Sequence, residues 1–307
     1  MVEKGNSTQL TLTSPSPLAG LGRKADQGRG EGAAASAFLA PATFVVVLML
    51  IAPLLLLARF SINRFDPTEL MVDAATPANY IRFFTDPFYV QVMRVTVWVA
   101  VLSTALCLLF GLPIAYRLAR TQSRQKSMLM LLIILPLFVG STVRTVGWMI
   151  LFAHGGMVDV LAERWFGAHV DLMYTTTAVV AGIVSINLPF VILTLQSVFE
   201  GIDARLEEAA RGLGAAPGRA FWRIVWPLAL PGVLIAGILS FILAMNAYAT
   251  PYLLGGPRFQ MMAPLIWYEF GSNNNWPFAA ALAFILMGTT LLLTALSNTL
   301  VPRRYRG

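Results

Sequence analysis

Long apolar runs separated by short polar segments organise this 307-residue chain. Six of the runs are long enough to cross the hydrocarbon core of a bilayer as a helix, which takes about 20 residues. They cover approximately residues 38–57, 92–116, 128–152, 176–195, 228–250 and 278–301. The pattern therefore predicts an all-α, polytopic membrane protein with six transmembrane helices.

The composition agrees with this prediction and excludes a soluble domain. Hydrophobic residues make up 57% of the chain and charged residues 12%, so there are too few charges to solvate a globule of this size. The net charge of +7 comes from short basic clusters between the apolar runs. We assign these clusters to orientation and to contact with membrane lipid headgroups, and expect no nucleic-acid partner.

The distribution of Lys and Arg predicts which loops face the cytoplasm. If six spans alternate sides, fifteen of the 22 basic residues lie on the side of the N-terminus and seven lie in the opposite loops or within spans. The positive-inside rule then places both termini in the cytoplasm, together with the loop between the fourth and fifth spans. Residues 1–36 are polar and lack apolar periodicity, so we expect a disordered cytoplasmic tail.

Candidate catalytic and metal-binding residues are sparse. The single cysteine, Cys107, lies inside an apolar run, and His154 and His169 lack the spacing of metal ligands. No phosphate-binding GxxxxGK[ST] motif occurs. The sequence thus predicts no metal, no cofactor and no enzymatic site, and any process driven by ATP would have to draw its energy from another subunit.

The most informative segment is the charged stretch 203–231 between the fourth and fifth runs. Asp203 is placed to cap a short helix rich in strong helix formers, and Gly214 is placed to end it in a left-handed turn. Pro217 suits the first turn of a second helix. Ala209 and Ala210 lie side by side among charged residues, which lets another surface approach closely.

This stretch resembles the EAA signature of permease subunits in binding-protein-dependent ABC importers. The matching positions are Glu208, Ala209, Ala210, Gly214, Ile224 and Pro227. One position departs, since Trp226 stands where the family usually has leucine. The resemblance implies a six-helix type I permease domain over residues 37–307, in which a coupling loop at about 200–227 docks onto a cytoplasmic ATPase.

Further segments resemble the spermidine/putrescine branch of that family. They are STVRTVGW at 141–148, NAYATPYLLGGPRFQMMAPLIWYEF at 246–270 and NWPFAAALAFIL at 275–286. The resemblance implies a permease of the bacterial inner membrane for a polyamine or a related amine or amino-acid-like compound. It also implies cytoplasmic ATP-binding subunits, a second permease subunit and an extracytoplasmic solute-binding protein as partners.

The third run contains an arginine among small polar residues. An arginine near the bilayer centre costs about 2.5 to 3.5 kcal/mol on insertion scales, so Arg144 should face a bundle interior or a watery cavity. The alternative is that Arg144 extends to the outer headgroups. On the first interpretation Ser141, Arg144 and Trp148 share one helix face and line the translocation path, to which we add Asn246 and Tyr248 at the end of the fifth run.

Alternative functions and solutes remain open from the sequence. An ion-coupled secondary transporter would need ionisable residues or broken helices at mid-membrane, usually in two repeated halves, whereas a membrane assembly subunit would lack the EAA signature. All acidic residues fall in loops or tails, so no span offers a carboxylate to a cationic solute. Either ordinary solvated loop charges or an outer acidic vestibule can explain Asp159, Glu163, Asp171 and Glu269.

Overall fold

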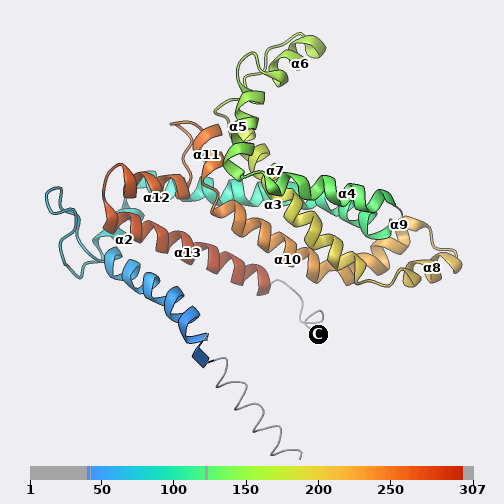
Figure 1. Cartoon of the computed structure of the whole chain (residues 1–307), viewed down its shortest axis with the longest axis horizontal. Coiled ribbons are helices and arrows are strands. Elements are labelled where there is room, and N and C mark those ends of the chain that lie inside the picture. The colour runs from blue at the N-terminus through green and yellow to red at the C-terminus, as the bar shows by residue number, and fades with distance from the viewer. Residues whose placement is uncertain (1–39, 42, 122–123, 300–307) are drawn as a thin grey trace, which may run out of the picture. The chain divides into compact units, whose positions relative to one another are not determined.

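The computed structural model describes residues 40–41, 43–121 and 124–299 (Figure 1). The chain divides into two units, Met1–Leu57 and Ala58–Gly307. The apolar helix Thr43–Ser61 holds nearly all of the described residues of the first unit and continues a few residues beyond it. The tail predicted at 1–36 lies outside the described residues.

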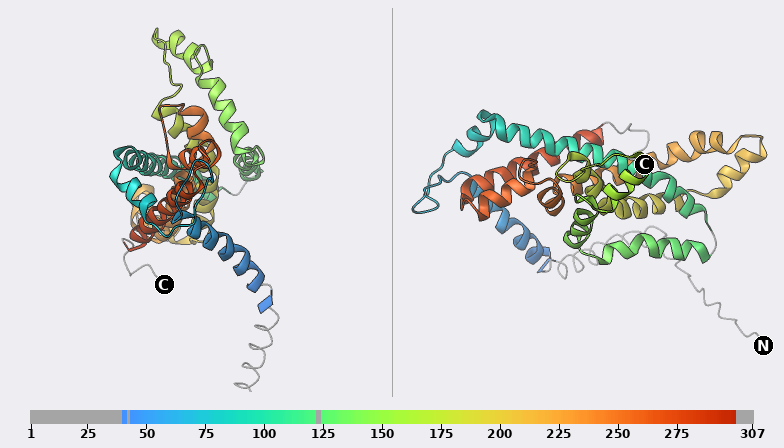
Figure 2. Two further views of the ribbon diagram at one scale, coloured as in Figure 1. Left: turned by 90° about the vertical axis from the view of Figure 1, so that its left-hand side faces the viewer. Right: turned by 90° about the horizontal axis from the view of Figure 1, so that it is seen from above.

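Four long helices lie side by side in the second unit (Figures 1 and 2). They are α3 (Pro87–Arg120), α7 (Thr176–Glu200), α10 (Trp226–Met245) and α13 (Trp276–Thr299). Helices α3, α7 and α10 pack closely on one another, and α13 lies against α10. Gly232 of α10 shows how close the approach is, because a Cβ atom there would lie 2.3 Å from a methyl group of Val198 on α7. Small residues permit such backbone approach where helices associate in membranes.

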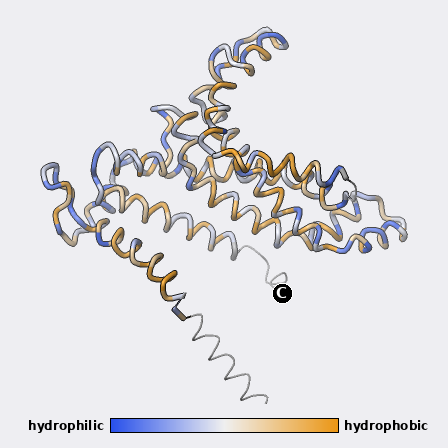
Figure 3. The backbone as a smooth tube through the Cα atoms, viewed as in Figure 1, coloured by the Kyte–Doolittle hydropathy of each residue, from blue (hydrophilic) through white to orange (hydrophobic). Residues whose placement is uncertain are grey.

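Short helices lie at the two ends of this bundle (Figure 1). At one end are α2 (Ala78–Thr85) and α12 (Met262–Gly271), with the short helix α11 (Ala249–Leu254) between α10 and α12 in the chain. At the opposite end are α8 (Ala204–Gly212) and α9 (Pro217–Ala220). Hydrophobic residues run along the bundle helices, and hydrophilic residues gather at the α8 end (Figure 3).

The third predicted span is wrong as a single helix. The segment instead forms α4 (Arg124–Ile134), a 3₁₀ turn η1 (Leu135–Phe138), α5 (Ser141–Phe152) and α6 (Met157–Phe166). Pro136 has no N–H to donate, and Gly140 is extended with ψ 146°, so the α-helical ladder stops between α4 and α5. Helix α4 runs along the bundle, whereas α5 leaves it at a steep angle (Figures 1 and 2).

The predicted number of membrane-crossing helices is confirmed. Within the described residues six helical segments have sufficient length and hydropathy, and they are Thr43–Ser61, Pro87–Arg120, Ser141–Phe166, Thr176–Glu200, Pro217–Met245 and Trp276–Ser297. The Ser141–Phe166 segment is interrupted between α5 and α6. The Pro217–Met245 segment begins eleven residues before the predicted start at 228, because the second helix of the charged stretch continues directly into α10.

Candidate functional site

The loop that carries the EAA signature forms a well-capped helix followed by a left-handed turn. The Asp203 side chain accepts a hydrogen bond from the Arg205 N–H at 2.9 Å. At the other end Gly214 has φ +88°, and its N–H and that of Ala215 bond to the carbonyls of Arg211 and Ala210 at 2.9 and 3.0 Å. This pair of bonds is a Schellman motif, which satisfies the last carbonyls of α8.

The second half of the loop is the start of a long helix. Pro217 lies in the first turn of α9, and a π-helical turn η2 (Phe221–Val225) links α9 to α10. Within it the Trp226 N–H reaches the Phe221 carbonyl, five residues back. This wider turn accommodates Pro227, which cannot donate to the ladder. Trp226 packs on Trp222, with ring centroids 5.2 Å apart, so the departure from the family pattern is absorbed by aromatic packing.

The signature residues differ in exposure. Glu208 and Ala209 are exposed, and Ala210, Ile224 and Pro227 are half-buried. Helix α8 has no buried residue, and Leu213 at its end is 91% exposed. An apolar side chain this exposed, beside small residues on a capped helix, is suited to contact with another protein.

A cluster of polar side chains joins α8 to the bundle. Both oxygens of the Glu207 carboxylate accept hydrogen bonds, one from Arg120 Nε at 2.9 Å and the other from the Tyr116 hydroxyl at 2.6 Å. A second ion pair connects Lys126 on α4 with Glu200 at the end of α7 at 2.8 Å. Sequence reasoning missed these pairs, because their partners lie far apart in the chain.

Helix α5 places the residues predicted for the translocation path at different depths. Ser141 is exposed, and Trp148 donates from Nε1 to the Ser185 hydroxyl on α7 at 2.7 Å. Arg144 lies between them and is half-buried, with Nε and Nη1 buried and without a hydrogen-bond acceptor among the described residues. The first interpretation of Arg144 requires a bundle or cavity around it, and the burial of these two atoms agrees with that requirement.

A cavity of about 320 Å³ brings part of the predicted set together. Ser141 from α5, Asn187 from α7, and Asn246 and Tyr248 from the segment after α10 all line it. The lining contains no charged residue and combines six polar residues with six apolar ones, and neither Arg144 nor Trp148 belongs to it. Three of the five predicted path residues therefore share one cavity.

Two aromatic residues near Tyr248 were not singled out from the sequence. Tyr252 stacks on Tyr248 with ring centroids 5.6 Å apart, and Trp267 on α12 lies 5.8 Å from Tyr248. All three rings are more than one third exposed. The spacing of four between Tyr248 and Tyr252 was the available signal, whereas the approach of Trp267 depends on the fold.

The acidic residues considered for an outer vestibule are partly used within the protein. The Asp159 side chain is buried and accepts hydrogen bonds from the Gly155 and Val170 N–H groups at 2.9 and 3.0 Å. Glu269 is buried on α12 and accepts from the Asn273 amide at 3.1 Å. These two carboxylates therefore stabilise the loops next to their own helices.

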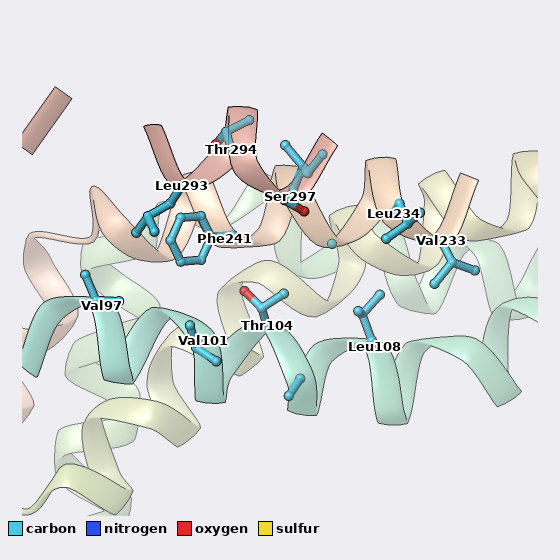
Figure 4. Close-up of a pocket in the computed structure, with 13 residues that line it drawn as sticks. Val97, Val101, Thr104, Leu108, Val233, Leu234, Phe241, Leu293, Thr294 and Ser297 are labelled. Atoms are coloured by element: carbon cyan, nitrogen blue, oxygen red, sulfur yellow. The ribbon is translucent and has the colours of Figure 1, made fainter. Parts of the chain in front are cut away.

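A separate groove of about 420 Å³ between α3, α10 and α13 is almost entirely apolar (Figure 4). Val101, Leu108, Phe241 and Leu293 are among its lining residues. It contains no charged residue, and its few hydroxyls include those of Thr104 and Thr294. This lining offers no hydrogen-bonding set for a polar solute, so the groove is a poorer candidate for a translocation path than the cavity beside Tyr248.

Comparison with known proteins gives consistent matches. Residues 78–306 match the family model described as "Binding-protein-dependent transport system inner membrane component". The chain is 30% identical over 267 residues to the spermidine/putrescine transport system permease protein PotB of Haemophilus influenzae, which covers 85% of this chain and 93% of the relative. It is also 30% identical over 191 residues to the molybdenum transport system permease protein ModB of Mycobacterium tuberculosis, covering 61% of this chain and 71% of the relative.

A solved structure with the same fold is a bacterial ABC transporter involved in the import of the acidic polysaccharide alginate. The TM-score is 0.70, with 15% sequence identity, and the match covers 90% of this chain and 97% of that chain. This likeness concerns the fold alone.

Proposed function

This chain belongs to the family of binding-protein-dependent transport system inner membrane components, and we propose that α8 and α9 form its docking site for a cytoplasmic ATPase. The chain is a transmembrane permease subunit of an ABC importer and contributes to the path of the solute across the bacterial inner membrane. The sequence lacks a phosphate-binding motif, so in this proposal the chain has no ATPase site of its own.

The observation that carries the docking site is the geometry of the EAA loop. A capped helix with no buried residue is followed by Gly214 at φ +88°, and Leu206, Ala209 and Leu213 are exposed along it. The next helix then enters the bundle without interruption. A partner that binds α8 would thus have a direct mechanical connection to the transmembrane region.

For the solute we propose a polyamine or a related amine or amino-acid-like compound. The long match to a spermidine/putrescine permease supports this class, and the exposed rings of Tyr248, Tyr252 and Trp267 offer faces that attract ammonium groups. We propose that the path runs past Ser141, Asn246 and Tyr248, with Arg144 and Trp148 on the adjoining helix. The described membrane-crossing segments carry three acidic residues near their ends, but Asp159 is bonded to its own loop, Glu200 pairs with Lys126 and Glu163 lies 3.5 Å from His169. None of them lines the cavity beside Tyr248, so selection by charge is assigned to the binding protein.

The proposed assembly contains a second permease subunit, ATP-binding subunits in the cytoplasm and an extracytoplasmic solute-binding protein. Both termini and α8 are proposed to face the cytoplasm, as the fifteen-to-seven distribution of basic residues indicates. Single cysteines at Ala168 and Ala216, both exposed, test the orientation with an impermeant reagent in intact cells. Only Ala168→Cys should react, and native Cys107 gives no background because it is buried.

Uptake by the reconstituted importer tests the solute class. Proteoliposomes that contain the permeases, the ATPases and the binding protein should accumulate radiolabelled spermidine or putrescine when ATP is enclosed on the ATPase side. Molybdate serves as the comparison solute. Accumulation of molybdate without either polyamine would overturn the proposed class, while leaving the assignment to the importer family intact.

A further inference from the structure

Helix α8 has few apolar contacts that could fix its position. None of its residues is buried, and the elements that it mainly contacts are the short helix α9 and the turn η2, which follow it directly in the chain. Packing of an amphipathic face usually holds a short helix in place, since helices of this length are marginal on their own. The hydrogen bonds of the Glu207 side chain hold α8 in place instead of apolar packing.

The Glu207 carboxylate lies in a nearly complete set of donors. Arg120 Nε and Nη2 both reach Oε1, and the Tyr116 hydroxyl donates to Oε2. The pair is shielded from solvent, with side-chain exposures of 20% for Arg120 and 16% for Glu207. Charge-assisted bonds of this kind are about twice as strong as neutral ones.

Arg120 also extends to the end of α7. Its Nη1 donates to the carbonyls of Ile202 at 3.0 Å and Phe199 at 3.3 Å. These carbonyls lie at the helix terminus, where backbone acceptors lack partners within the helix. One guanidinium therefore connects the last turn of α3, the end of α7 and the first turn of α8.

Tyr116 adds the return half of the loop to the same cluster. Its ring packs edge-on against Phe199 at 5.6 Å and against Phe221 of η2 at 5.0 Å. The chain thus enters the coupling loop beside this ring at Phe199 and leaves it beside the same ring at Phe221. Both ends of the loop share one contact point on α3.

We propose that Arg120, Tyr116 and Glu207 form a positioning clamp that makes α8 move as one piece with the ends of α3 and α7. The clamp rests on the proposed docking of α8 to an ATPase and extends it, because it names the residues through which displacement of α8 reaches two bundle helices besides α10. Arginine suits position 120 better than lysine, because its planar guanidinium bonds the carboxylate and the two carbonyls at once, whereas a lysine ammonium is a single point of donors.

The test uses the complete importer in proteoliposomes and measures solute transported per ATP hydrolysed, together with ATPase co-purification. Arg120→Met should lower transport per ATP about fivefold or more, in the range of measured coupling energies, while the ATPase still co-purifies. Glu207→Gln should have a similar effect. The double variant should transport as much solute per ATP as Arg120→Met alone, because both substitutions remove the same interaction. Arg120→Lys should recover part of the loss.

Arg117→Met is the matched control, since Arg117 lies in the same last turn of α3 and its side chain is exposed. It should keep the wild-type ratio. Tyr116→Phe retains the ring packing and removes only the bond to Glu207, so it decides the matter if Arg120→Met fails to reach the membrane. An unchanged ratio in Tyr116→Phe and Glu207→Gln would overturn the clamp.

The outcome separates the clamp from the docking site. If Gly214→Val uncouples the importer while the clamp variants remain coupled, the clamp is wrong and the docking site stands. If Gly214→Val and Glu208→Arg both keep full transport and ATPase binding, the docking site is wrong and the clamp is overturned with it.

Discussion

Two arginines of the second unit differ in how their guanidinium groups are satisfied. Arg120, at the α8 end of the bundle, bonds to a carboxylate and two carbonyls. Arg144, on α5, has buried Nε and Nη1 atoms without an acceptor among the described residues. The acceptors of Arg120 thus come from this chain, whereas the described part of the chain supplies none for the two buried nitrogens of Arg144.

The difference indicates where the permease needs other molecules. An unpaired buried polar group costs about 1–3 kcal/mol, and more when it is charged. At the α8 end that cost is avoided, because Arg120 is bonded to groups of the same chain. The described residues offer Arg144 no acceptor for its buried Nε and Nη1 atoms, so its acceptor has to come from elsewhere: water, a lipid headgroup, the solute or another subunit.

The largest expected effect comes from a substitution in the turn that follows α8, the helix on which Arg120 binds Glu207. Gly214→Val places a branched side chain at φ +88°, which costs about 1–2 kcal/mol and redirects α9. The space beside Gly214 is open, so the effect is one of backbone conformation and not of a clash. We expect substrate-stimulated ATP hydrolysis to fall about tenfold in proteoliposomes. The matched control is Gly212→Ala, which also has open space but no positive φ; equal activity of the two variants would contradict the prediction.

The next largest effect concerns Arg144 on α5, whose buried nitrogens lack an acceptor among the described residues. Arg144→Leu removes the charge and should ease membrane insertion, yet we expect uptake to fall about fivefold, because the proposed path includes the guanidinium of Arg144. Uptake is measured in cells and divided by the amount of permease in the membrane. Arg94→Leu, on α3, provides a control for loss of one positive charge from a predicted span. Normal uptake by Arg144→Leu would show that the arginine serves only to reach the headgroups.

A smaller effect tests a satisfied neutral group. The Thr96 hydroxyl donates to the Val92 carbonyl at 2.8 Å and accepts from the Met262 N–H at 2.9 Å. Thr96→Val leaves that buried N–H without an acceptor, so the free energy of unfolding should fall by about 1–3 kcal/mol. Thermal denaturation of the purified permease in detergent measures the loss. An unchanged melting temperature would contradict this account of the α3–α12 contact.

The smallest effect tests an unsatisfied neutral group on the same helix. The Thr104 hydroxyl is buried in the apolar groove and has no hydrogen-bond partner among the residues that the structure describes. Thr104→Val keeps the shape and removes a polar group, so it should be neutral or slightly stabilising, within about 1 kcal/mol. The same denaturation experiment applies. A loss as large as that of Thr96→Val would mean that Thr104 has a bonding partner in the detergent-solubilised protein.

The sequence predicted the elements whose causes are local. Hydropathy was sufficient for the number of spans, and Asp203, Gly214 and Pro217 were sufficient for the boundaries of α8 and α9, because caps and left-handed turns depend on neighbouring residues. The break of the third span was missed although Pro136 and Gly140 were visible, because proline is often tolerated within membrane helices, as Pro113 and Pro189 are here.

The parts that the sequence could not predict depend on the packing of distant segments. In the sequence Glu207 is one of several charged residues of a short helix. Only the fold shows that Arg120 and Tyr116 of α3 lie beside it. Trp267 lies 19 residues after Tyr248, at no periodic spacing, and only the fold places their rings together. Periodicity identifies the face of one helix, but it contains no information on which faces meet.

The uninterrupted helix from Pro217 to Met245 connects the proposed docking loop directly to the opposite end of the bundle. It has 29 residues and is therefore about 43 Å long at 1.5 Å per residue. If such a rod pivots at its α9 end by about 5°, its far end is displaced by about 4 Å. That far end leads directly to Asn246 and Tyr248, which line one cavity together with Ser141. A small rotation at the proposed docking loop would therefore shift one wall of that cavity by about that distance.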